Sequence, residues 1–155
     1  MIEIFNDWDL LKVKNSDSKL VVIDKVNQTV SIDDFSIDYP GEYEKSWILS
    51  EVCQYDEKLF YNVHVEWKLI TILFKEVNEI NEKLLSFFGD VDVLLTTWTK
   101  WMKKIVENIE SRVVIPFWEA KDLLLNDLWQ HKEEINNFKL KNEMWVENTE
   151  YVNLV

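Results

Sequence analysis

The sequence predicts an α/β fold formed by a single domain over residues 1–155. A first half of short alternating segments and a second half with apolar residues at helical spacing together predict this class. The length is that of one domain, and no internal repeat or linker rich in Pro, Gly or Ser divides the chain. With 47% hydrophobic and 14% aromatic residues, the composition is that of a globular protein with a sizeable core.

The first half of the chain is typical of a meander of hairpins. Apolar and polar residues alternate in several of its segments, as they do in half-buried antiparallel strands. The predicted strands cover residues 2–5, 19–23, 28–32, 46–52, 59–65 and 68–74.

The hydrophobic period changes after Val77. A first helix is predicted by the apolar face of Ile80, Leu84, Phe87 and Phe88, and Gly89 stands where a left-handed residue ends a helix. Residues 90–95 then predict a buried strand, residues 99–110 a second helix, and residues 111–116 another short strand. A strand, a helix and a strand at this spacing predict a βαβ unit.

The remaining residues predict a third helix and two closing strands. The helix covers residues 119–131, and its inward face is predicted to carry Ala120, Leu123, Leu124 and Leu128. The closing strands lie in NFKLK and EYVNLV, so the second half contains both helices and strands.

Charge and cysteine content limit the partners of this protein. Lys and Arg total 17 against 29 Asp and Glu, and the net charge of −12 repels nucleic acid and anionic membrane surfaces. Cys53 is the one cysteine, which excludes an internal disulfide and a thiolate zinc cluster and favours a reducing, cytoplasmic location. The start of the chain lacks a signal-peptide pattern, and no apolar run is long enough to cross a bilayer, so no membrane partner is expected.

Four segments occur in a characteristic order: IDYPGEYE, INEKLLSFFGDVDVLL, RVVIPFW, and FKLK with EYVNLV. Together they resemble the metallo-β-lactamase superfamily, in particular small bacterial lactonase-like proteins known as metal-dependent hydrolases. The resemblance implies a shortened αβ/βα sandwich with mixed sheets flanked by helices. Pro40 and Gly41 fall in the first segment, where a tight turn needs a fixed φ followed by a permissive one.

The residues at the family's metal-binding positions differ from the pattern. Residues 25–34, KVNQTVSIDD, contain no histidine where the family carries its histidine and aspartate cluster, so that segment is interpreted as deleted. By register, Ile72 and Trp118 replace histidines, and Lys75 replaces a bridging aspartate. Zinc requires imidazole nitrogens and carboxylate oxygens, and a lysine ammonium repels the cation. We therefore predict no metal site, no cofactor and no catalytic residues, and the residues of a binding site stay unknown.

Three functional hypotheses follow from the resemblance. The first is a degenerate, non-catalytic member that serves as a binding, regulatory or assembly subunit, with a protein partner or a second copy of the chain. The alternative is a lactonase-like metal-dependent hydrolase with a rearranged site, which requires Asp and Glu side chains converging near Lys75 and Trp118. The third is a purely structural oligomer.

The remaining polar candidates favour structural roles. His64 alternates with two valines and is expected to be exposed or hydrogen bonded on its strand, while His131 is expected to cap the third helix. Cys53 has no recognisable base partner, so thiol catalysis has no signature here.

Several acidic residues raise the same question. Asp90 and Asp92 have the spacing of paired carboxylates for Mg²⁺ or acid–base work, but a scaffold role is favoured. Glu42 and Glu44 are expected to be part of a turn and strand, and residues 33–34 part of a solvated face.

Tryptophan is unusually frequent and glycine unusually rare, with eight and two residues respectively. In proteins of the resembled family, glycine stands at the positions of Trp47, Trp67, Trp98 and Trp129. Trp47 follows PGEYEKS and Trp67 precedes the KLITIL strand, while Trp98 follows DVDVLLTT and Trp129 ends the third helix. A tryptophan pays a steric cost at φ > 0, so one hypothesis is that UGA codons meaning glycine were translated as tryptophan. The other is that these residues are core or interface aromatics.

Overall fold

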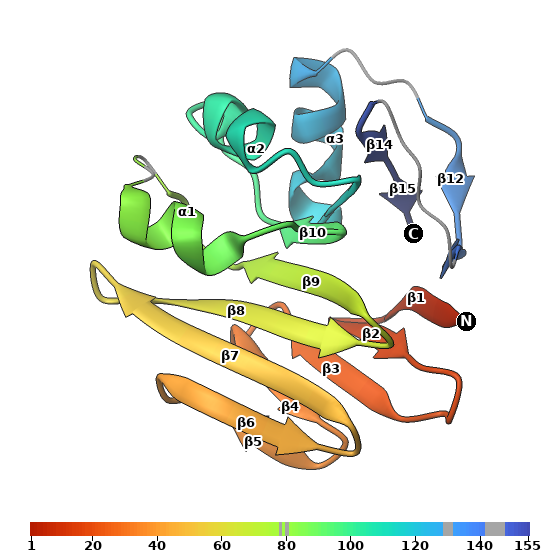
Figure 1. The fold of residues 1–155 in the computed structure, drawn as a ribbon. Helices are drawn as coiled ribbons and strands as arrows, with labels where there is room; N and C mark the ends of the chain where they lie inside the picture. Colours follow the sequence, from red (N-terminus) through yellow and green to blue (C-terminus); the bar gives the residue numbers. More distant parts are fainter. Residues whose placement is uncertain (78, 80, 129–131, 142–147) are drawn as a thin grey trace.

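The computed structural model describes residues 1–77, 79, 81–128, 132–141 and 148–155 (Figure 1). Three residues of the sequence-based predictions, Ile80, Trp129 and His131, lie outside the described residues. The backbone of Trp118 is described, whereas its side chain is not. In the part of the chain that is described, no helix has the length and apolar character needed to span a bilayer.

A six-stranded antiparallel sheet forms one layer of the molecule. Its strand order is β13-β1-β2-β3-β4-β5. The strands are β1 (Ile2–Asp7), β2 (Leu10–Lys14), β3 (Leu20–Asp24), β4 (Thr29–Ile32), β5 (Phe35–Ile37) and β13 (Asn137–Leu140). Residues on β2, β3 and β4, and on the first half of β1, alternate between buried and half-buried, as expected from their apolar and polar alternation. The outer strands β5 and β13 each have one buried residue and exposed residues beside it.

A seven-stranded mixed sheet forms the second layer, with order β14-β11-β10-β9-β8-β7-β6. Its strands are β6 (Gly41–Lys45), β7 (Ile48–Tyr55), β8 (Lys58–Val65), β9 (Lys68–Leu73), β10 (Val93–Thr96), β11 (Val113–Pro116) and β14 (Glu150–Tyr151). Pairing is antiparallel from β6 to β9 and parallel from β9 to β14. A short parallel pair joins β12 (Glu134–Ile135) to β15 (Asn153–Leu154).

The helices are α1 (Glu82–Phe88), α2 (Lys103–Ile109) and α3 (Trp118–Asp127), and all three lie on one side of the two sheets (Figure 1). One apolar layer, which includes Ile4, Ile23 and Ile72, fills the space between the sheets. A second layer, which includes Leu84, Val106 and Leu124, packs the helices against the seven-stranded sheet. The predicted α/β sandwich is confirmed.

The predicted βαβ unit is also confirmed. Strands β10 and β11 are parallel neighbours, and α2 connects them. The apolar face predicted for the second helix is buried: Met102 precedes α2 as its N-cap, and Ile105, Val106 and Ile109 lie on the helix. This agreement follows from the clear helical spacing of these four residues.

The predicted inward face of the third helix is wrong at one residue. Leu123 is exposed, whereas Leu125 is buried together with Ala120 and Leu124. Successive residues of a helix are separated by about 100°. Leu123 and Leu125 therefore lie on opposite sides of Leu124, and α3 is rotated so that Leu125 faces the sheet.

Gly89 ends α1 as predicted. Its φ of 64° lies in the region that favours glycine, and its N–H donates to the carbonyl of Leu85 at 3.2 Å. At the other end of α1, the Asn81 side chain accepts a hydrogen bond from the N–H of Leu84 at 3.0 Å. The boundaries of this short helix are thus determined by its own sequence.

Candidate functional site

The carboxyl ends of the parallel strands β9, β10 and β11 meet at one edge of the seven-stranded sheet, which is where α/β proteins commonly bind ligands. Aromatic side chains occupy this edge. The rings of Phe74 and Phe117 stack with their centroids 5.8 Å apart, and Tyr61 meets Phe74 edge-on at 5.8 Å. Trp98 is buried, and its indole N–H donates to a carboxylate oxygen of Asp127 at 2.7 Å. Ring packing and a polar contact to α3 hold this edge together.

The structure places the predicted metal positions in different surroundings. Ile72 is 0% exposed and lies in the layer between the sheets, paired with Tyr61 on β8 and Leu95 on β10. Lys75 follows β9 and is exposed to solvent. Within the described ranges, no group of three or more His, Cys, Asp or Glu side chains is arranged to hold a metal ion. The donors that zinc requires do not converge around these two positions in the described structure.

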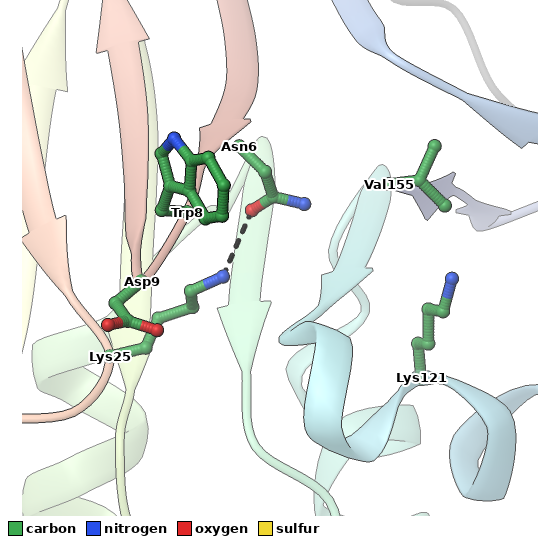
Figure 2. Close-up of a pocket in the computed structure, with 6 residues that line it drawn as sticks. All are labelled: Asn6, Trp8, Asp9, Lys25, Lys121 and Val155. Atoms are coloured by element: carbon green, nitrogen blue, oxygen red, sulfur yellow. Dashed lines mark hydrogen bonds between the residues drawn. The ribbon is translucent and has the colours of Figure 1, made fainter.

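A cleft of about 530 Å³ opens between the six-stranded sheet and α3 (Figure 2). Segments distant in sequence contribute to it: the β1–β2 turn, the residue after β3, the first turns of α3, and the end of the described chain. Its lining residues are Asn6, Trp8, Asp9, Lys25, Lys121 and Val155. We call this space the lysine cleft, because two lysine side chains line it.

Lys25 lies at the sheet side of the lysine cleft and is only 7% exposed. Its ammonium donates to the side-chain oxygen of Asn6 at 3.2 Å, as Figure 2 shows. The Asn6 amide donates in turn to the carbonyl of Leu154 on β15 at 3.3 Å. The backbone N–H of Lys25 donates to the carbonyl of Asp9 at 3.2 Å. These contacts fix the lysine relative to both the β1–β2 turn and β15.

Lys121 lies at the helix side of the same cleft. Its side chain is 13% exposed and its Nζ is 3.6 Å from Oε1 of Glu134, whose side chain is mostly exposed. An ammonium group in a partly dehydrated setting attracts anions more strongly than one in bulk water. The lysine cleft therefore presents two cationic groups in a chain whose net charge is −12.

His64 is placed as predicted. It is half-exposed on β8, and its Nε2 lies 2.6 Å from Oε1 of Glu51 on the neighbouring β7. Cys53, also on β7, is a partly exposed free thiol. Both residues contribute to the strand surface and stand apart from the lysine cleft, whose lining includes neither.

Asp90 and Asp92 belong to one ionic cluster with Arg112. The guanidinium donates to both oxygens of Asp90, at 3.0 and 3.1 Å, and to Oδ1 of Asp92 at 3.2 Å. The hydrogen bonds from Arg112 lower the pKa of Asp90, and Asp90 in turn raises the pKa of Arg112. The scaffold role predicted for these carboxylates agrees with this pairing.

The acids of residues 33–34 are hydrogen bonded, and Asp34, whose side chain is 90% exposed, lies on a solvated face as predicted. Asp33 accepts hydrogen bonds from the Ser46 hydroxyl at 2.7 Å and from the N–H of Leu20 at 3.3 Å. Asp34 accepts from the ammonium of Lys45 at 2.5 Å. The β4–β5 turn and the β6–β7 hairpin lie side by side, so these contacts join the two sheets. Glu42 and Glu44 are exposed on β6, as expected for turn and strand positions.

No pattern in the sequence indicates the lysine cleft as a whole. Asn6, Lys25 and Lys121 are far apart in the chain, and no spacing rule links them. A weak local signal exists at Lys25, which directly follows an alternating strand. The cleft itself depends on how α3 packs beside the six-stranded sheet.

No protein-family model and no curated protein matches the sequence. A solved structure from Thermotoga maritima, assigned as a Zn-dependent hydrolase of the metallo-β-lactamase superfamily, matches with a TM-score of 0.73.

The chain has the metallo-β-lactamase fold. The match covers 98% of each chain at 16% sequence identity. At this identity the likeness concerns the fold alone. The metallo-β-lactamase fold expected from the sequence segments is confirmed, and function has to be argued from the site residues.

Proposed function

We propose that this protein is a non-catalytic binding protein built on the metallo-β-lactamase fold. The observation that carries the proposal is the pair Ile72 and Lys75, which stand where the sequence resemblance places a metal-binding histidine and a bridging aspartate. Ile72 is enclosed between the sheets, and Lys75 is exposed at the end of β9. Hydrocarbon and ammonium groups at these positions supply no ligand for a divalent cation.

The carboxylates of nearby strands support the same proposal. Asp90 and Asp92 are bound to Arg112 at the amino ends of β10 and β11, whereas Lys75 and Trp118 follow the carboxyl ends of β9 and β11. Asp127 accepts the indole N–H of Trp98. Recruiting any of these groups to a metal would require breaking a hydrogen bond that stabilises the fold. A binding role leaves these hydrogen bonds intact.

A metal-dependent hydrolase of the lactonase-like type is the alternative. The assignment of the Thermotoga maritima protein as a Zn-dependent hydrolase on the same fold favours it. Such an enzyme would need a rearranged set of oxygen and nitrogen ligands near Lys75 and Trp118. The binding proposal accounts better for Ile72 and Lys75, which stand where the resemblance places a metal-binding histidine and a bridging aspartate.

The two functions differ in zinc content and turnover. The purified protein would be dialysed against zinc and analysed for bound metal, and then assayed with lactone and ester substrates. The Thermotoga maritima protein, treated identically, is the positive control. The binding proposal predicts zinc well below one ion per chain and no hydrolysis. Stoichiometric zinc with turnover that a chelator abolishes would establish the hydrolase instead.

Assembly and location form part of the same proposal. A subunit role implies a second copy of the chain or a protein partner, which light scattering on the purified protein would detect as a mass above that of the monomer. The single cysteine fits the reducing conditions of the cytoplasm.

A further inference from the structure

We propose that the lysine cleft binds a small anion through a carboxylate or phosphate group, with Lys25 and Lys121 as the binding residues. This inference rests on the proposed binding function and identifies its site and ligand class. It arises from residues of four separate segments that the fold brings together around one space (Figure 2).

The size of the cleft suits a small molecule. Its volume of about 530 Å³ falls within the range of roughly 300–1,000 Å³ that is common for small-ligand sites. The lining combines apolar atoms from Trp8 and Val155 with polar groups from Asn6, Asp9 and the two lysines. Polar groups placed beside apolar surface are typical of sites that orient one charged end of a ligand.

The charges of the cleft select for an anion. Lys25 and Lys121 come from opposite walls, and both are largely removed from solvent. Low-dielectric walls strengthen the attraction between an ammonium and an anionic ligand. The amide of Asn6 is hydrogen bonded to both Lys25 and β15, so one wall is held in place before the ligand arrives.

Two carboxylates also face this region and limit affinity. Asp9 lines the cleft, and Glu134 lies 3.6 Å from the Lys121 ammonium. An anion would compete with Glu134 for Lys121. Because the Glu134 side chain is 65% exposed, this ion pair is weak and an anion can displace it. Glu134 thus acts as a replaceable counter-ion in the absence of ligand.

Isothermal titration calorimetry with inorganic phosphate, and separately with citrate, tests the proposal. We expect saturable binding of at least one probe, weakened about ten-fold in Lys121→Met and strengthened in Glu134→Gln. Lys83→Met, a similar change at an exposed position on α1, is the matched control and should leave binding unchanged. Because Lys25 is buried, Lys25→Met is interpreted only if its circular dichroism spectrum matches that of the parent.

The outcomes separate this inference from the proposed function. No saturable binding of either probe, or equal binding in the parent and Lys121→Met, would overturn the anion site. Zinc-dependent hydrolysis on the same sample would refute the non-catalytic proposal, whatever the calorimetry shows. Binding of phosphate but not citrate would assign a phosphate ligand. Binding of citrate but not phosphate would assign a carboxylate ligand.

A second inference rests on backbone conformation alone and concerns three tryptophans. Two-residue loops close the β6–β7 and β8–β9 hairpins, with φ of 55° and 64° at Ser46 and Trp47, and 46° and 67° at Glu66 and Trp67. Two consecutive left-handed residues are typical of the type I′ turn, whose second position favours glycine. Trp8, in the β1–β2 turn, has φ of 56°.

No packing compensates the backbone strain at these residues. Trp8, Trp47 and Trp67 are 92%, 89% and 101% exposed. In the described chain, every other non-glycine residue with positive φ is Ser, Asp, Gln or Glu. A large exposed aromatic in a left-handed turn thus adds strain without burying surface.

We infer that Trp8, Trp47 and Trp67 correspond to UGA codons that the source organism reads as glycine. Trp98 lacks the left-handed backbone and is buried with its N–H bonded to Asp127, so the backbone provides no reason for glycine there. A glycine at position 8 would remove the indole from the wall of the lysine cleft and leave the contact between Lys25 and Asn6 in place.

Reading the gene decides this second inference. UGA at codons 8, 47 and 67 is the expected result, and UGG at all three would overturn it. Trp47→Gly and Trp67→Gly should each raise the midpoint of thermal unfolding by about 3 °C, because glycine adopts positive φ without strain. Trp101→Gly is the matched control, since Trp101 is exposed but has no left-handed φ, and this change should not stabilise the protein.

Discussion

Arg112 holds Asp90 through two parallel hydrogen bonds, with Nη1–Oδ1 at 3.0 Å and Nη2–Oδ2 at 3.1 Å. The same guanidinium reaches Asp92, whose other oxygen accepts the N–H of Leu69 at 2.8 Å. The segments that begin β9, β10 and β11 are therefore connected through one cation and two carboxylates. Residues that resemble a metal-binding pair in sequence thus work as a clamp on the parallel strands.

Replacing Arg112 with Met should lower the free energy of unfolding by about 1–2 kcal/mol, because Asp92 is left partly buried without its cation. Urea denaturation would measure the loss. Lys104→Met, an exposed change on α2, is the control and should stay within about 0.5 kcal/mol. Equal effects of the two substitutions would contradict a role for Arg112 in joining the strands.

Stability should decrease in acid. The pKa of Asp90 is lowered by hydrogen bonds from Arg112, and that of Asp33 by the hydroxyl of Ser46, both below the ordinary value of 3.8. A carboxylate with a lowered pKa stabilises the fold above its unfolded pKa, and this contribution is lost as the pH falls through the folded pKa. Unfolding followed from pH 6 to pH 2 should show stability falling below about pH 4. In Asp33→Asn the fall should be shallower, and an unchanged profile would argue against this assignment.

Asn62 connects the seven-stranded sheet to the end of α1. Its amide donates to the carbonyl of Phe87 at 2.5 Å, and its oxygen accepts from the hydroxyl of Thr71 at 2.7 Å, with Asn62 and Thr71 both buried. Asn62→Ala should cost about 2–4 kcal/mol, because two buried polar groups lose their partner. The double variant Asn62→Leu/Thr71→Val should cost less than the sum of the single changes, as a double-mutant cycle would show. Strict additivity would mean that the two side chains act independently.

Gly89→Ala should destabilise the protein by about 1–3 kcal/mol. The cause is conformational: φ is 64° and ψ is −144°, while the nearest side-chain atom to an added Cβ, from Leu69, is 4.0 Å away. Ser86→Ala, at an exposed position within α1, is the matched control and should be nearly neutral or slightly stabilising. Thermal unfolding compares the two, and a neutral Gly89→Ala would show that the chain relaxes out of the left-handed region.

Truncation to alanine should lower the free energy of unfolding strongly at Ile72 and hardly at all at Lys75. Ile72→Ala removes a fully buried side chain between the sheets and should cost about 2–5 kcal/mol. Lys75→Ala changes an exposed residue and should stay within about 0.5 kcal/mol. Denaturant titration of both variants checks this. A large loss for Lys75→Ala would reveal a structural role that its exposure does not indicate.

Elements with strong local periodicity could be predicted from the sequence. The four inward residues of α2 have clean helical spacing, and Gly89 marks the end of α1, so both helices and the strands between them were correctly ordered. Strands β2, β5 and β12 were not predicted, and β6 was expected only as turn and strand around Glu42 and Glu44. β5 has three residues, β12 has two, and GEYEK of β6 has no fully buried position, so none of them shows a clear apolar alternation. β2 does alternate between buried and half-buried residues and was missed.

The candidate site could not be predicted, for a different reason. Lys25 and Lys121 become neighbours of one cleft only because α3 packs beside the six-stranded sheet, and no local pattern encodes that packing. The misassignment of Leu123 has a related origin, since three leucines in a row leave the rotation of a helix ambiguous until its contacts are known. Local signals determined the elements, and tertiary packing determined the cleft.

The pairing of β1 with β13 has a consequence for biosynthesis. Ile2 pairs with Leu140 and Glu3 with Lys139, so the first strand finds its outer neighbour only near the end of the chain. On the ribosome, β1 leaves the exit tunnel well before residues 137–140 are made, and meanwhile its unpaired N–H and C=O groups can pair with other chains. Until translation has passed Leu140, the outer edge of β1 stays open to pairing with another chain.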